Sequence, residues 1–187
     1  MKKTGLYLAL AAALGLGMTA CNRTESPAAG ATAEQAAPAT QDNPFFVQSD
    51  LPLQYPHFDR IKDSDFGPAF DAGMAQQLKE VEAIANNAEA PTFDNTIIAM
   101  ENSGQVLDRA ATVFFNLSST DTNDARKKLD ADYSPKFAAH RDAIYLNGKL
   151  FERVQALYDQ RDTLGLDAEG VRLVERYYTD FVRAGAK

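Results

Sequence analysis

The sequence predicts an all-α fold. After Lys62, apolar residues recur at steps of three and four, which is the spacing of one face of an α-helix. No segment alternates cleanly between apolar and polar residues, as a half-buried strand would. At 187 residues the chain is long enough for one ordinary domain, on a prior of roughly 100–200 residues per domain. We therefore expect a single body of amphipathic helices, preceded by a leader and a tether.

Residues 1–20 have the features of a lipoprotein signal peptide. The start is basic, and the apolar stretch from Leu6 to Met18 is too short to span a membrane. Thr19-Ala20-Cys21 closes this stretch and resembles a lipobox, in which the cysteine thiol is acylated and becomes the first mature residue. The sequence therefore predicts an anchor that attaches the chain to a membrane.

Cys21 is the predicted lipidation site, and Asn22 after it favours the periplasmic face of the outer membrane. The alternative is ordinary cleavage near Ala20, which would leave a free thiol. Residues 21–42 are rich in Ala, Pro and Thr and contain no aromatic residue. Such a segment cannot bury enough apolar area to offset its conformational entropy, so we expect a disordered tether.

Residues 43–62, here called the strap, are interrupted by three prolines and carry four aromatic residues. The pattern is irregular, and we expect an extended segment laid over the helices. The first helix should follow, with Asp63, Ser64 or Asp65 as its cap and Pro68 tolerated in its first turn. Its expected apolar stripe is Phe66, Phe70, Met74, Leu78, Val81 and Ile84.

A second helix is expected to begin at the N-cap Thr92 and to continue to Leu117 without a break. Gly104 would lie inside it, at a close contact between helices, because glycine in a helix interior costs roughly 1 kcal/mol relative to alanine. Its expected core face is Ile97, Met100, Gly104, Leu107, Ala111, Phe114 and Leu117.

Three further helices complete the prediction. The third should run from Thr122 to Leu146, kinked or split at Pro135 and ended by Gly148 as C-cap. The fourth is marked by Leu150, Phe151, Val154, Leu157 and Tyr158. The fifth should be capped by Asp167, with a core face of Val171, Val174, Tyr178 and Phe181 and with Tyr177 at the edge of that face.

Charge and residue types narrow the function. The net charge is -7, from 19 Lys+Arg and 26 Asp+Glu, which disfavours nucleic acid as a partner. Two His and one Cys are too few for a zinc site built from those residues alone. His140 falls on the apolar stripe of the third helix and is best explained as a packing histidine, while His57 lies far away in the strap. We therefore predict no catalytic residue and no metal ligand in this chain.

Six segments in a fixed order indicate a family. They are Asn43–Phe46, Pro56–Lys62, Asp65–Met74, Glu89–Gly104, Ala139–Asn147 and Glu175–Ala186. This series resembles the amino-terminal region of the M3 zinc peptidases, especially the bacterial peptidyl-dipeptidase and oligopeptidase A branch. The resemblance covers Asn43 to Lys187.

The resemblance implies a helical body with a deep channel that admits short peptides, with zinc at its floor. In the family, a His-Glu-x-x-His helix and a later glutamate hold the zinc, far downstream of the region that this chain matches. Residues 43–187 would thus be the amino-terminal region of such a peptidase, truncated and inactive by itself. The alternative is a stand-alone, lipid-anchored helical module that binds a partner without catalysis.

Overall fold

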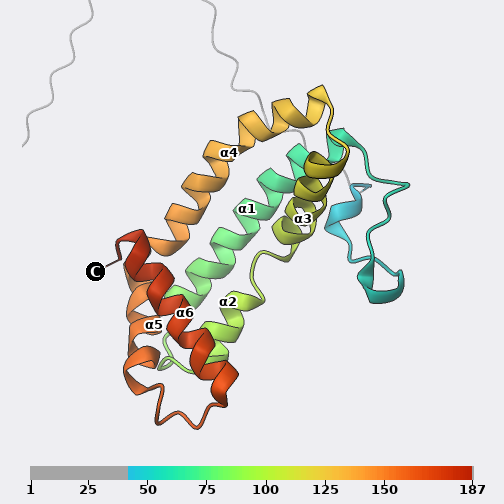
Figure 1. Ribbon diagram of the computed structural model, residues 1–187. Coiled ribbons are helices and arrows are strands. Elements are labelled where there is room, and N and C mark those ends of the chain that lie inside the picture. Colours follow the sequence, from blue (N-terminus) through green and yellow to red (C-terminus); the bar gives the residue numbers. More distant parts are fainter. Residues whose placement is uncertain (1–41, 187) are drawn as a thin grey trace, which may run out of the picture. The chain divides into compact units, whose positions relative to one another are not determined.

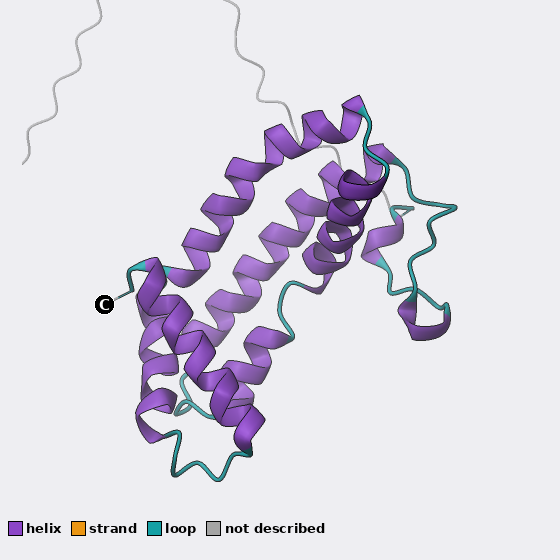
Figure 2. Cartoon of the chain, viewed as in Figure 1, coloured by secondary structure: helices purple, strands orange, loops and turns teal. Residues whose placement is uncertain are grey.

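The computed structural model describes residues 42–186, and every regular element in this range is helical. The prediction of an all-α fold is therefore confirmed (Figures 1 and 2). The predicted signal peptide, Cys21 and nearly all of the predicted tether lie outside the described residues. The elements are η1 (Pro44–Phe46), η2 (Pro52–Gln54), α1 (Asp63–Ala85), η3 (Phe93–Ile98), α2 (Ala99–Glu101), α3 (Gln105–Thr120), α4 (Asp124–Tyr145), α5 (Gly148–Gln160) and α6 (Ala168–Ala184). None of the described helices is both long and apolar enough to cross a membrane.

Helix α1 is the central element of the body. It packs most extensively on α3 and also contacts α4 and α5, so it joins the two halves of the structure (Figure 1). Its N-terminus is stabilised by Asp65, whose carboxylate accepts a hydrogen bond of 2.8 Å from the backbone N–H of Lys62. Asp63, Ser64 or Asp65 was predicted as the cap, but the N-cap is Lys62, and Asp65 contributes from the third position of the helix.

The body has two apolar cores, one in each half. The first, which we call the aromatic core, joins the strap to α1, α3 and α4, and is centred on Phe66, Phe70 and Phe114, whose rings stack or meet edge to face at 5.2–6.0 Å. The second joins α1, η3, α2, α4, α5 and α6. Its fully buried side chains include Ile97, Leu150, Val154, Val174 and Phe181.

Helices α1 and α3 approach each other closely at Gly73 in α1. A Cβ atom at this position would lie 2.7 Å from the backbone nitrogen and 2.8 Å from the Cα of Leu107 in α3. The absence of a side chain is therefore what allows α1 and α3 to pack so closely.

The prediction of one continuous helix from Thr92 to Leu117 is wrong. The cap at Thr92 is confirmed, because its hydroxyl accepts a 3.0 Å hydrogen bond from the N–H of Asn95. The chain then forms a π-helical turn, η3, and leaves the helix at residues 102–104 before α3 begins. Gly104 has a φ of 73°, in the left-handed region that glycine adopts without strain, and its N–H donates to Glu80 at 2.8 Å.

The third helix differs from its prediction in two respects. Helix α4 is not split, because Pro135 lies on its exposed side, where water can hydrate the carbonyl group that the proline leaves unpaired. Gly148 is not a C-cap but the first residue of α5, whose N-cap is Asn147 through a 3.1 Å hydrogen bond from the N–H of Leu150. The predicted N-cap of α6, Asp167, is confirmed by a 2.8 Å hydrogen bond from the N–H of Gly170.

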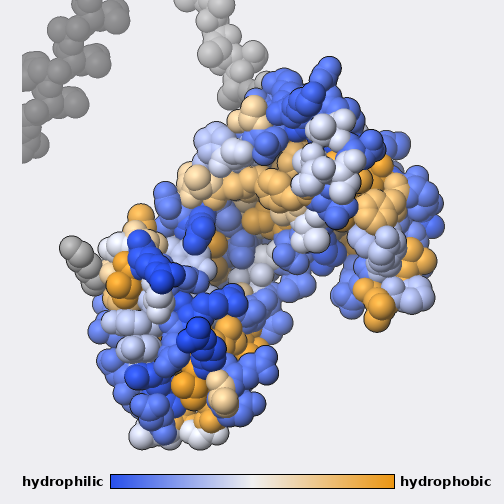
Figure 3. Space-filling view, viewed as in Figure 1, coloured by the Kyte–Doolittle hydropathy of each residue, from blue (hydrophilic) through white to orange (hydrophobic). Residues whose placement is uncertain are grey.

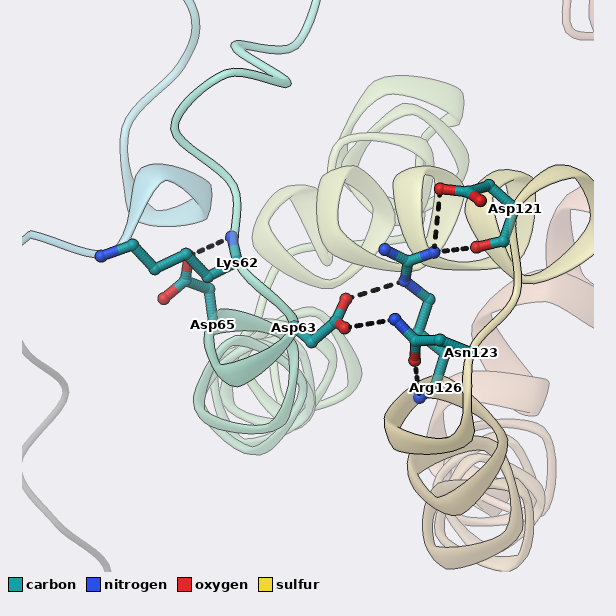
Figure 4. A network of polar contacts seen from close by, with 6 residues as sticks. All are labelled: Lys62, Asp63, Asp65, Asp121, Asn123 and Arg126. Atoms are coloured by element: carbon teal, nitrogen blue, oxygen red, sulfur yellow. Dashed lines mark hydrogen bonds and ion pairs between the residues drawn. The ribbon is translucent and has the colours of Figure 1, made fainter.

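A polar network fastens the start of α4 to the start of α1 (Figure 4). Arg126 pairs with Asp63 at 2.7 Å, and Asn123 donates to the other carboxylate oxygen of Asp63 at 2.7 Å. Both contacts favour the ionised carboxylate, and the hydrogen bond from Asn123 is the main reason that the pKa of Asp63 lies below its usual value. Arg126 also donates to the backbone carbonyl of Asp121.

Candidate functional site

A cavity of ≈ 620 Å³ lies between the strap and α3. Its walls combine apolar side chains with acidic and basic groups from both elements. The lining residues are Asp42, Asn43, Pro44, Phe45, Val47, Gln48, Ser49, Asp50, Gln54, Pro56, His57, Arg60, Ile61, Asp108, Arg109, Thr112 and Val113.

Three contacts anchor the inner edge of the strap. The side chain of Asn43 donates to the carbonyl of Asp65 at 2.8 Å and accepts from the N–H of Phe45 at 3.0 Å. The ring of Phe45 is buried in the aromatic core, 5.1 Å from the ring of Phe66. Arg109 on α3 donates to the carbonyl of Phe45 at 3.0 and 3.3 Å. The strap is thus a fixed part of the body.

His57 is the only histidine that lines this cavity. Its Nε2 lies 2.6 Å from a carboxylate oxygen of Asp50, and this hydrogen bond is the main cause of the lowered pKa of Asp50. The neighbouring Ser49 hydroxyl donates to the carbonyl of Tyr55 at 2.6 Å rather than to the imidazole. The three side chains therefore stabilise the strap and do not form a nucleophile with its general base.

His140 has the packing role expected from the sequence. It is buried on α4, and its Nε2 lies 2.7 Å from the amide oxygen of Gln77 on α1. Burial lowers the pKa of His140, which keeps the imidazole neutral near pH 7. His140 lines neither of the two described pockets, and its partner differs from that of His57.

The second core contains a polar cluster that the sequence pattern did not reveal. The hydroxyl of Tyr177 on α6 donates to Glu101 of α2 at 2.7 Å, and Arg176 lies 3.9 Å from the same carboxylate oxygen. Tyr177 is buried and Tyr178 is half-buried, so the prediction that Tyr178 is the core residue and Tyr177 the edge residue is wrong. Tyr178 instead stacks on Tyr158 with ring centroids 3.8 Å apart.

Arg153 on α5 is a buried cation that sequence reasoning also missed. Its guanidinium donates to the carbonyls of Asn87 and Glu89 at 3.0 Å each and to the side chain of Asn95 at 2.8 Å. Its partners lie 58 to 66 positions away in the chain, so no local motif indicates them. The contacts hold the loop between α1 and η3 against α5.

The described residues do not fit a zinc ion. His57 and His140 are engaged with Asp50 and Gln77, and no group of three His, Cys, Asp or Glu side chains with the geometry of a metal site occurs in residues 42–186. A catalytic zinc needs at least three converging protein ligands. No step of metal chemistry is therefore assigned to these side chains.

The chain is similar in sequence to two bacterial dipeptidyl carboxypeptidases. It is 49% identical over 148 residues to the dipeptidyl carboxypeptidase of Escherichia coli (strain K12), covering 79% of this chain and 22% of that protein. It is also 49% identical over 145 residues to the dipeptidyl carboxypeptidase of Salmonella typhimurium, covering 78% and 21%. No protein-family model matches the chain. The chain therefore spans about a fifth of the length of these curated relatives, and the similarity supports the predicted relation to the M3 peptidases.

Proposed function

We propose that residues 43–187 act as the amino-terminal helical region of a zinc-dependent dipeptidyl carboxypeptidase of the M3 type. The observation that carries this proposal is the 49% identity over 148 residues to the enzyme of Escherichia coli. The zinc and its ligands would be supplied by a part of the peptidase outside residues 42–186. The substrates would be short peptides, from whose carboxyl ends such an enzyme releases dipeptides.

The geometry supports a structural role for this region within the peptidase. Two apolar cores, the Gly73 contact and the Arg126 network give it a defined shape. The buried polar groups Tyr177, Arg153 and His140 make hydrogen bonds within the body and do not converge on one cleft. Such a body is suited to forming the wall of a substrate channel while other residues perform the chemistry.

Residues 1–42 would connect this region to a membrane. We propose that residues 1–20 are a lipoprotein signal peptide, that Cys21 is acylated, and that residues 22–42 are a tether. The peptidase would then act at the cell envelope, at the periplasmic face of the outer membrane. The support for this step is the Thr19-Ala20-Cys21 sequence.

A chimeric enzyme tests the proposed function. The 148 matched residues of the Escherichia coli enzyme would be replaced with those of this chain, and dipeptide release from a short peptide would be measured with zinc present. We expect the chimera to release dipeptides at a rate close to that of the parent. A folded, zinc-loaded chimera that releases none would refute the proposal.

The cavity beneath the strap favours a second candidate function. Its ≈ 620 Å³ volume falls in the range of small-ligand sites, roughly 300–1,000 Å³, and its walls combine apolar surface with acidic and basic side chains. The chain would then be a lipid-anchored binding module without catalysis. An inactive chimera, together with a peptide or partner bound by the chain itself, would favour this candidate.

A further inference from the structure

The outer edge of the strap carries an unusual concentration of exposed apolar side chains. Nine large hydrophobic residues are exposed in the described structure, and five of them lie between residues 47 and 58. We call these five the strap patch. They are Val47, Leu51, Leu53, Tyr55 and Phe58. Single exposed apolar residues are ordinary on protein surfaces, but a cluster within one short segment marks an interaction site.

The tip of the strap patch is the most exposed point of this cluster. Leu53 is fully exposed, with a relative accessibility of 101%, and Tyr55 retains 62%. Both belong to or adjoin η2, which Figure 1 shows hanging away from α1 and α3 at the far side of the strap. In the space-filling view, apolar surface appears along the outer edge of this segment (Figure 3).

The backbone under the patch adopts the left-handed conformation at two residues. Leu53 and Gln54 have φ values of 58° and 57°, and both carry a Cβ atom that disfavours this left-handed region. Backbone hydrogen bonds from Gln54 to Leu51 (2.9 Å) and from Tyr55 to Pro52 (3.2 Å) close the turn. These two hydrogen bonds stabilise the turn on which Leu53 is exposed.

The cavity beneath the strap adjoins the strap patch. Val47 belongs to both surfaces, and the apolar walls of the cavity include Pro44, Pro56, Ile61 and Val113. On the rim, the carboxylate of Asp50 is already paired with His57 at 2.6 Å. The lining also includes the charged residues Asp42, Arg60 and Asp108, so the complement of this surface is an apolar projection flanked by polar groups.

From these observations we infer that the strap patch is the docking surface for the remainder of the peptidase. This inference rests on the proposed function. The matched region is only 22% of the Escherichia coli relative, so more than three quarters of that protein lies outside the match and is the natural occupant. A second copy of this chain or a free peptide would be the competing occupants.

Thiol labelling tests this inference without relying on enzyme activity. Leu53→Cys would be placed in the full chain, with Cys21→Ala to remove the single native cysteine, and also in the chimera described above. The labelling rate would be measured at that position by mass spectrometry. Ala131→Cys, on the exposed side of α4 among charged residues, is the matched control.

We expect labelling at position 53 to be slower by about tenfold or more in the chimera than in the chain alone, with position 131 unchanged. Equal labelling at position 53 in both proteins would overturn the inference. Protection that appears in the chain alone and rises with its concentration would assign the patch to a second copy and overturn it as well. Because labelling does not depend on catalysis, an inactive chimera with a protected position 53 would refute the proposed function and leave the docking surface standing.

As a second variant, Tyr55→Ser in the chimera should lower its thermal midpoint, and Val182→Ser, at an exposed position on α6, should not. Val182 has 46% exposure and lies outside the strap. If the two substitutions have the same effect, the docking surface is not at the strap.

Discussion

Gly73→Ala should destabilise the protein even though alanine is the better helix former. The added Cβ would lie 2.7 and 2.8 Å from backbone atoms of Leu107, and a backbone atom cannot rotate away as a side chain does. Helix α3 must therefore move outward. That movement would loosen the packing of Phe70 on Phe114, whose ring centroids are 5.3 Å apart.

The expected magnitude follows from two opposing terms. Overpacking a well-packed core costs about 1–3 kcal/mol, and a clash with backbone belongs in the upper half of this range. Replacing glycine by alanine inside a helix returns about 1 kcal/mol. The free energy of unfolding should thus fall by about 1–2 kcal/mol, which lowers Tm by about 2–8 °C for a chain of this size.

Circular dichroism at increasing temperature measures this change. Gly148→Ala is the matched control, because this glycine is also helical but an added Cβ would have no neighbour within 4 Å. We expect the Tm of the control to be unchanged or slightly raised. If Gly73→Ala is as stable as the parent chain, the space at Gly73 does not limit the packing of α1 on α3, and the reasoning fails.

Three further predictions address a tyrosine, an arginine and the lipidation site. Burial and a hydrogen bond to Asp71 raise the pKa of Tyr133 from 10.0 to about 12. The contribution of Tyr133 to the free energy of unfolding should therefore be complete below pH 10 and lost as the pH rises toward 12. In urea titrations Tyr133→Phe should reduce this loss, and a free energy of unfolding that falls with pH as steeply as in the parent would contradict the assignment. Arg153→Met removes the charged donor of three acceptors, and a hydrogen bond to a charged group contributes about 1.5–3 kcal/mol to stability. Hydrogen exchange in residues 86–92 should therefore be faster in this variant. The control Arg172→Met, at an exposed position, should leave that exchange unchanged. Cys21→Ala should abolish membrane partitioning and leave unprocessed precursor, and palmitate labelling that persists in this variant would rule out Cys21 as the acylated residue.

The parts of the fold that depend on near neighbours were predicted well from the sequence. The caps at Thr92 and Asp167 involve residues within one turn of each other, and the predicted apolar stripe of α1 is correct except at Leu78, which is exposed. The buried position of His140 followed from its place on the stripe of α4. Local periodicity and capping chemistry are sufficient for such features.

The features that were missed depend on contacts distant in sequence. The break at Gly104 is stabilised by Glu80 on another helix, and Tyr177 is buried because its hydroxyl meets Glu101, 76 positions away. Helix α4 continues through Pro135 because that side of the helix faces solvent, and the spacing of apolar residues does not indicate this. The strap cavity and the shape of η2 likewise arise only when the strap packs against α3.

The central claim is that this region supplies structure while the zinc chemistry lies elsewhere in the peptidase. The most direct measurement is the zinc content and kcat/KM of the chimera after both of the chain's histidines are replaced, as His57→Asn and His140→Gln. We expect a full equivalent of zinc and a kcat/KM within about threefold of the unmodified chimera. Loss of the zinc, or a fall in kcat/KM by several orders of magnitude in a folded protein, would contradict the claim.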